Sequence, residues 1–129
     1  MNEKSCLQIA VGIAALVPVI AGASGTLMVP GVLDLARSPE GETHVAYLSG
    51  LLLGIGLAFW SQLPSIEKHG RIFSLLAALV VLGGLARLLT AIRLQAWDGS
   101  VLGPLAMELL VTPALLLWQR RIARLSGQP

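Results

Sequence analysis

The sequence predicts an all-α integral membrane protein, a four-helix bundle that runs up-down-up-down with both termini in the cytoplasm. Hydrophobic residues make up 55% of the 129 residues and charged residues only 12%, about half the charged share of a soluble domain. The apolar residues form four runs, each close to the ~20 residues that cross a bilayer as a helix. Lysine and arginine are distributed unequally between the ends of these runs, which predicts the orientation.

We expect the spans at about residues 6–28, 45–63, 72–92 and 101–118, in a single transmembrane domain that covers residues 1–129. The first run shares features with a signal peptide, including a small-residue stretch at Ala21-Gly22-Ala23. It is longer than a typical signal-peptide core, so an uncleaved span is predicted. Two of the three connections are short, which favours antiparallel neighbours in the bundle.

Orientation follows from the basic residues outside the spans. The side that carries both termini holds Lys4, Lys68, Arg71, Arg120, Arg121 and Arg124. The other side holds Arg37 and Arg93. Trp60 and Trp118 fall at the inner boundary, where aromatic residues anchor membrane helices. These positions predict a multi-pass protein of a bacterial inner (plasma) membrane, with the lipid bilayer as its surroundings.

Two charged residues lie inside the predicted spans. Arg87 is in the third span and Glu108 in the fourth. A lone ionised side chain at the centre of a bilayer costs about 2.5 to 3.5 kcal/mol on insertion scales. At a rise of 1.5 Å per residue, Arg87 lies about 9 Å and Glu108 about 10 Å below the outer boundary. The two residues match in depth on neighbouring helices, so we expect them to form a buried ion pair.

Small and polar residues accompany this pair. The candidate ligand-binding or structural polar cluster comprises Arg87, Glu108, Ser49, Thr90, Thr112, His44 and Tyr47. Close helix packing is expected at Gly50, Gly54, Gly83 and Gly84, since small residues let helix backbones approach. One interpretation is tight packing around a structural pair that fixes helix rotation and register. The other is a cavity, open to the periplasm, that binds a small molecule, a lipid or an ion.

Several function classes find no support in the sequence. There is no P-loop, nucleophile elbow or metal-ligand signature, so no cofactor and no metal are expected and enzyme chemistry is disfavoured. The net charge of +2 is scattered, which argues against a nucleic-acid partner. The single cysteine, Cys6, excludes an internal disulfide.

Several stretches of the chain resemble a known family. They are His44 with residues 47–56 (YLSGLLLGIG), residues 83–90 (GGLARLLT), and residues 107–109 (MEL) followed by Pro113. These elements are similar to those of the small bacterial membrane proteins grouped as DUF4345, a domain of unknown function. Members often carry an arginine ahead of the glycines of the second span, where this chain has His44-Val45-Ala46-Tyr47. The resemblance implies a four-helix membrane domain and no assigned activity.

The favoured interpretation is a non-enzymatic packing or accessory module that associates with itself or with a larger membrane complex. The alternative is a small-molecule, lipid or ion-binding protein, or a minimal transporter, with a pocket at Arg87 and Glu108. The neutralised pair favours the first interpretation, because an ion already satisfied by its partner has less need of a ligand.

Overall fold

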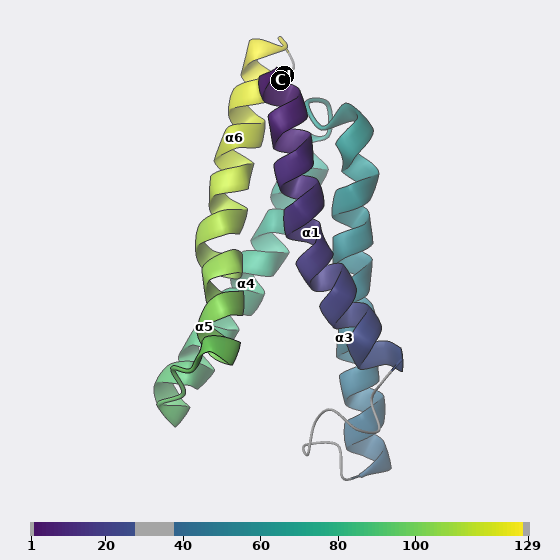
Figure 1. The fold of residues 1–129 in the computed structure, drawn as a ribbon, viewed down its shortest axis with the longest axis vertical. Helices are drawn as coiled ribbons and strands as arrows, with labels where there is room; N and C mark the ends of the chain where they lie inside the picture. The colour runs from purple at the N-terminus through teal and green to yellow at the C-terminus, as the bar shows by residue number, and fades with distance from the viewer. Residues whose placement is uncertain (1, 28–37, 128–129) are drawn as a thin grey trace. The chain divides into compact units, whose positions relative to one another are not determined.

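The computed structural model describes residues 2–27 and 38–127, and their regular structure is entirely helical (Figure 1). Its helices are α1 (Glu3–Leu27), α3 (Pro39–Gln62), α4 (Gly70–Leu94), α5 (Gly99–Ala106) and α6 (Thr112–Leu125). A 3-10 turn, η1 (Leu63–Ser65), follows α3, and a π-helical turn, η2 (Met107–Val111), joins α5 to α6. The predicted all-α class is confirmed, and no strand occurs within the described ranges.

Four helical stretches are long and apolar enough to cross a membrane. They are Glu3–Leu27, Pro39–Ser65, Gly70–Leu94 and Gly99–Leu125. Each contains one of the predicted spans, except that the predicted end of the first span, Met28, lies outside the described residues. Arg37, which the sequence places on the outer side, also lies outside them. The helices are longer than the apolar runs because polar residues continue them. Glu40 and Glu42 occupy the first turn of α3, where negative charge complements the helix dipole.

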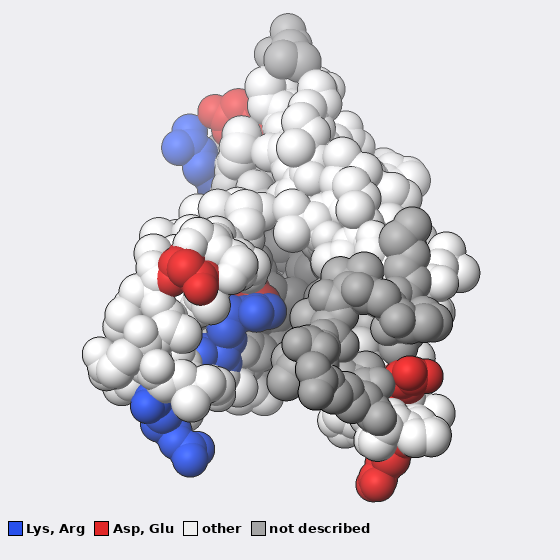
Figure 2. Space-filling model, turned by 60° about the horizontal axis from the view of Figure 1, so that its bottom comes forward, with Lys and Arg blue, Asp and Glu red and all other residues white. Residues whose placement is uncertain are grey.

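The outer surface of these helices is apolar. At most 22% of the most apolar window of each span is buried within the protein. On α4, Leu75, Leu82 and Leu89 form a stripe seven residues apart and are 62%, 64% and 64% exposed. Figure 2 shows a face on which acidic and basic side chains are few and most of the described surface is uncharged. Exposed leucine is unfavourable in water but matches lipid tails, as expected of a multi-pass membrane protein.

The chain divides into two compact units, residues 1–14 with 62–129 and residues 15–61. The single domain over residues 1–129 stays a prediction, and each unit is described by itself. In the first unit the largest fully buried side chains are Phe73, Leu7, Ile66, Gln119 and Val11. They come from the start of α1, the turn before α4, the start of α4 and the second half of α6. The apolar core of this unit therefore lies at the end that carries both termini.

The second unit is built on the close approach of the later part of α1 to α3. A Cβ atom added at Gly22 would lie 2.5 Å from the backbone nitrogen of Leu53 and 2.7 Å from the carbonyl oxygen of Ser49. Gly25 approaches the side chain of Ser49, and Gly56 approaches Val19. The glycines that permit this helix contact are therefore Gly22, Gly25 and Gly56.

The predicted packing role of Gly50 and Gly54 lies outside this contact and stays a prediction. A Cβ atom at either position would meet no atom of the described residues within 4 Å. The face of α3 that contacts α1 passes through Ser49, Leu53 and Gly56, a helical i, i+4, i+7 stripe. Gly50 and Gly54 are each one residue further along, which turns them about 100° away from that stripe.

The first unit also holds an ion pair outside the spans. Lys4 Nζ lies 3.0 Å from Glu67 Oε2, and only 12% of the Glu67 side chain is exposed. Burial raises the pKa of Glu67, but its own backbone N–H and the charges of Lys4 and Lys68 lower it more. The net pKa of Glu67 is below its ordinary value of 4.5, so the structure stabilises the carboxylate form.

Replacing Gly22 with alanine is expected to destabilise the protein by about 1 to 3 kcal/mol, the usual cost of overpacking. The new methyl group would meet backbone atoms of α3, which cannot move aside as a side chain can. Thermal unfolding of the detergent-solubilised protein, followed by circular dichroism, measures the effect. Gly50→Ala is the matched control and should leave stability unchanged or slightly raised. Equal losses in both variants would contradict the α1–α3 contact.

The stability advantage of the native protein over Glu67→Gln is expected to depend on pH. When folding lowers the pKa of a carboxyl group, the ionised group stabilises the protein fully at any pH above its pKa in the unfolded chain. That stabilisation is lost as the pH falls through the pKa of the group in the folded protein. The difference in melting temperature should therefore be full at neutral pH and shrink below pH 4.5. Glu3→Gln, which removes a more exposed carboxylate near the same terminus, is the control. An unchanged difference down to pH 3 would contradict this role of Glu67.

Candidate functional site

Arg87 on α4 and Glu108 on η2 form a two-point ion pair. Arg87 Nε donates to Glu108 Oε2 at 3.0 Å, and Arg87 Nη2 donates to Glu108 Oε1 at 3.0 Å. A paired, charge-assisted geometry of this kind is stronger and more directional than a single contact. The Arg87 side chain is 43% exposed and that of Glu108 is 19% exposed. The protein itself thus leaves part of the guanidinium accessible, and burial of the pair within a bilayer stays a prediction.

The π-helical turn places Glu108 in a local irregularity of the last span. The backbone N–H of Thr112 donates to the carbonyl oxygen of Met107, five residues earlier, and Thr112 Oγ1 donates to the same oxygen at 2.9 Å. Pro113 follows directly and has no N–H to continue the α-helical pattern. Such turns inside α-helices are frequent at functional sites. Proline was the only sequence signal here, and it predicts a bend without predicting the π turn.

Gly84 brings α4 close to this turn. A Cβ atom at Gly84 would lie 2.8 Å from Glu108 Cβ and 2.8 Å from Leu109 Cδ2. Gly83, in contrast, has no atom of the described residues within 4 Å of the corresponding position, so its packing role stays a prediction. Gly83 and Gly84 are adjacent in sequence and therefore point about 100° apart around the helix, so only Gly84 faces η2. The same face of α4 carries Arg87, three residues later.

The remaining members of the predicted cluster are placed differently. Thr90 Oγ1 donates to the carbonyl oxygen of Ala86 at 3.1 Å, so its hydroxyl, like that of Thr112, bonds to its own helix. His44, Tyr47 and Ser49 belong to the second unit. His44 is exposed and Tyr47 is 64% exposed. The structure therefore brings Arg87 and Glu108 together, and a shared cluster with His44, Tyr47 and Ser49 stays a prediction.

The arrangement at Arg87 and Glu108 favours charge neutralisation over chemistry. The carboxylate is held by two guanidinium donors, and the nearby threonine hydroxyls are directed to backbone oxygens. In the part of the chain that the structure describes, no group of three or more His, Cys, Asp or Glu side chains could hold a metal ion. What these contacts can do is fix the rotation and register of two helices relative to each other.

One polar residue of the first unit was missed by sequence reasoning. Gln119 is fully buried, with 0% exposure, and its Nε2 donates to the carbonyl oxygen of Ile66 at 2.8 Å. Its neighbours in the sequence, Trp118 and Arg120, suggest a residue at the membrane boundary and give no sign of burial. The bond to Ile66 ties α6 to the turn before α4, a contact between residues 53 positions apart.

One comparison with known proteins gives a match. A family model described as "Domain of unknown function (DUF4345)" matches residues 6–119 of the chain. The matched region includes both Arg87 and Glu108. No curated protein and no solved structure shows a significant similarity to the chain.

A double-mutant cycle on Arg87→Gln and Glu108→Gln is expected to give a coupling energy of about 1 to 3 kcal/mol. Glutamine keeps most of the side-chain volume and removes the charge, so the coupling reports the ion pair rather than packing. Unfolding of each variant in detergent micelles measures it. Pairing Glu108→Gln with Arg93→Gln, on the same helix as Arg87, provides the control and should give no coupling. A coupling near zero for Arg87 and Glu108 would show that the pair does not hold these helices together.

Proposed function

The chain belongs to the DUF4345 family, and we propose that it is a non-enzymatic integral membrane module whose Arg87–Glu108 pair fixes its third and fourth spans inside the bilayer. On this proposal the module resides in a bacterial inner membrane and assembles with a second copy of itself or with a larger membrane complex. The ion pair provides a charge-neutral connection between two helices whose other surfaces are apolar.

The observation that carries this proposal is the two-point ion pair between α4 and η2. Both residues stand within stretches that are long and apolar enough to cross a membrane. Between helices in lipid there is no hydrophobic driving force, so polar contacts and close packing must hold them together. Removing one charge of the pair would leave the other charge uncompensated in apolar surroundings. The pair therefore selects one rotation of each helix.

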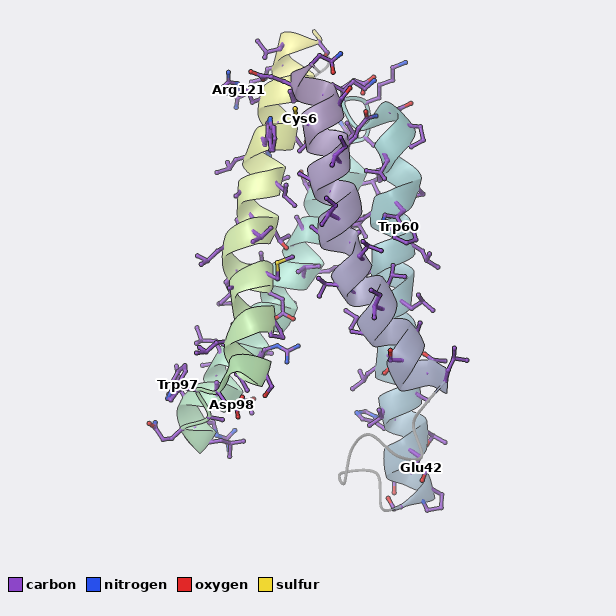
Figure 3. All side chains as sticks on the ribbon, in the orientation of Figure 1. Cys6, Glu42, Trp60, Trp97, Asp98 and Arg121 are labelled. Carbon is purple, nitrogen blue, oxygen red and sulfur yellow. The ribbon has the colours of Figure 1, made fainter. Side chains whose placement is uncertain are left out.

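The distribution of charge supports an orientation with both termini in the cytoplasm. In the first unit, Arg121 Nη2 lies 3.3 Å from Glu3 Oε1, and Lys4 pairs with Glu67. These contacts gather basic side chains at the end that carries the termini. Trp97 and Asp98 lie at the opposite end of the same unit from Arg121 (Figure 3). An excess of lysine and arginine on one side is typical of the cytoplasmic face.

The accessible part of Arg87 supports assembly with another helix. The pair engages Nε and Nη2, and 43% of the side chain stays exposed. A guanidinium group carries five N–H donors, and donors facing hydrocarbon without a partner are unfavourable. A carbonyl or carboxylate oxygen from a neighbouring membrane helix would satisfy them, and the exposed leucines beside Arg87 offer apolar surface for that helix.

The same accessibility favours one alternative, the binding of a small anionic molecule or lipid at Arg87 from the periplasmic side. A ligand of this kind would use the guanidinium donors that Glu108 does not occupy. The two functions differ in what they require of the charges. A structural pair needs the two charges to cancel, whereas a ligand site needs the positive charge of Arg87.

Replacing both residues together, as Arg87→Met with Glu108→Leu, is expected to preserve insertion, folding and assembly, with stability within about 1 kcal/mol of the native protein or above it. Both charges leave together, so neither is left uncompensated. Either single replacement should be clearly less stable. Thermal unfolding and native mass spectrometry of the purified protein measure stability and assembly. Native purification of wild type and double variant, with identification of co-purifying molecules, supplies the second readout. A well-folded double variant that loses a specific small molecule would contradict the structural role and favour the alternative.

A further inference from the structure

A basic pocket opens in the first unit, away from the Arg87–Glu108 pair. It has a volume of about 460 Å³ and lies between the first turns of α4 and the last turns of α6. Its lining includes Gly70, Arg71, Ser74, Gln119, Arg120 and Arg124. Three of these residues are arginines and none is acidic. The pocket is large enough for a small polar group, since ligand sites range from about 300 to 1,000 Å³.

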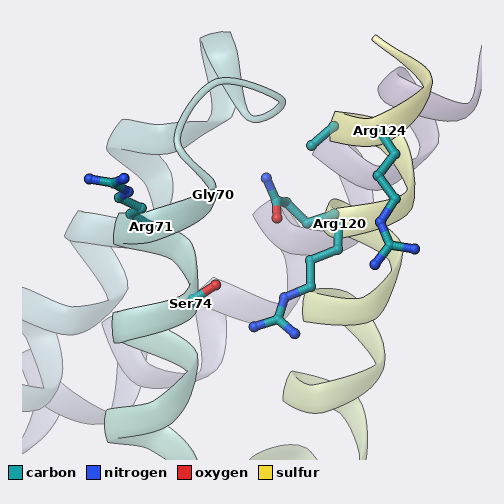
Figure 4. A pocket seen from close by; sticks show the side chains of 7 residues that line it. Gly70, Arg71, Ser74, Arg120 and Arg124 are labelled. Carbon is teal, nitrogen blue, oxygen red and sulfur yellow. The ribbon is translucent and has the colours of Figure 1, made fainter. Parts of the chain in front are cut away.

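The three arginines of this pocket are not neutralised by any residue that the structure describes. Among the described residues none of them has a carboxylate partner, whereas the neighbouring Arg121 pairs with Glu3. Figure 4 shows Arg120 extending from α6 toward α4 and Ser74, with the Arg71 and Arg124 side chains pointing outward to either side. Arg120 is thus the central cation of the pocket, and the other two extend its positive field to the rim.

Gln119 gives the pocket a buried acceptor that lacks a donor. Its side chain is fully buried, and the bond from Nε2 to Ile66 fixes the orientation of the amide. The other end of the amide, Oε1, has no hydrogen-bond partner in the part of the chain that the structure describes. Gly70 borders this amide, since a Cβ atom there would lie 3.5 Å from Nε2 and 3.8 Å from Oε1, at ordinary contact distance. Buried polar atoms are nearly always paired, so Oε1 requires a hydrogen-bond donor, and the hydroxyl of a ligand is one group that can supply it.

The start of α4 adds a second preference for an anion. Gly70 is the first residue of this 25-residue helix, and its N-cap residue, His69, makes no side-chain capping bond. The first backbone N–H groups of a helix have no partner within it, and the helix dipole favours negative charge there. Phosphate groups commonly bind at such helix starts. The ligand chemistry that fits is therefore an anionic phosphate with a hydroxyl donor beside it.

We propose that this pocket binds the headgroup of an anionic phospholipid that carries a hydroxyl, as phosphatidylglycerol does. Arg120 and the start of α4 contact the phosphodiester, and Gln119 Oε1 accepts a hydrogen bond from the headgroup hydroxyl. The inference rests on the proposed membrane location and orientation, which put this end of the bundle at the cytoplasmic leaflet. Anionic lipids give that leaflet its negative surface potential. It does not depend on the role of Arg87 and Glu108.

Lipid binding by the full-length protein in mild detergent tests this proposal, with native mass spectrometry as the readout. The probes are phosphatidylglycerol, phosphatidylcholine and phosphatidylmethanol, the last an anionic phosphodiester without a headgroup hydroxyl. We expect phosphatidylglycerol to bind most tightly and phosphatidylmethanol several-fold more weakly. Arg120→Gln should weaken phosphatidylglycerol binding about tenfold, as expected for the loss of a charge-assisted contact. Arg71→Gln, a second exposed variant, should act in the same direction.

Arg121→Gln is the matched control, because Arg121 is the next residue on α6, carries the same charge and does not line the pocket. Its effect should stay within about twofold. Equal losses in Arg120→Gln and Arg121→Gln would indicate general surface electrostatics and overturn the site. Equal binding of phosphatidylglycerol and phosphatidylmethanol would overturn the role of Gln119. Displacement of the lipid by millimolar inorganic phosphate would assign the pocket to a soluble phosphate instead. Circular dichroism confirms that each variant is folded.

Discussion

This structure depends on one constraint: a charged side chain in an apolar span must be neutralised by a side chain of opposite charge. Arg87 meets Glu108 through two parallel hydrogen bonds, and the surrounding sequence makes that contact possible. Gly84, on the same face of α4, has no side chain to hold η2 away from the helix. The π turn at Met107–Val111 carries Glu108, and Pro113 follows it. Gly84, Pro113 and the two charged residues therefore all contribute to the contact between α4 and η2.

Four arginines of the first unit differ in whether a carboxylate neutralises them, with different consequences for function. Arg87 has its carboxylate partner on the facing helix, so its contribution is to helix arrangement. Arg71, Arg120 and Arg124 lie at the end that carries the termini and have no carboxylate partner among the described residues. A charge that the protein has already neutralised contributes mainly to its own fold, whereas a cluster of unneutralised charge attracts an external anion. The basic end is therefore the better candidate for binding, and the pair for architecture.

The sequence predicts helix location better than helix rotation. Four apolar runs are sufficient to locate four spans, because the bilayer sets their length. The match in depth of Arg87 and Glu108 follows from counting residues, and the structure brings the two together. Whether Gly50 or Ser49, or Gly83 or Gly84, contacts a neighbouring helix depends on which face of the helix meets that neighbour. Adjacent residues point about 100° apart around the helix axis. Glycine-rich stretches offer several candidate faces, and side-chain packing of the partner helix selects among them.

The buried amide of Gln119 illustrates why the basic pocket escapes prediction. Its burial depends on a bond to Ile66 across 53 residues and on the approach of α6 to α4. Neither of these has a local sequence pattern, and the arginines around it are equally explained by the positive-inside rule. Arg120 and Arg121 are identical in type and adjacent in sequence, yet one lines the pocket and the other pairs with Glu3. The orientation of the protein in the membrane depends on the total number of basic residues on each side. Binding of a ligand depends on where each basic side chain points. The same set of arginines can therefore determine topology and still contain a specific site.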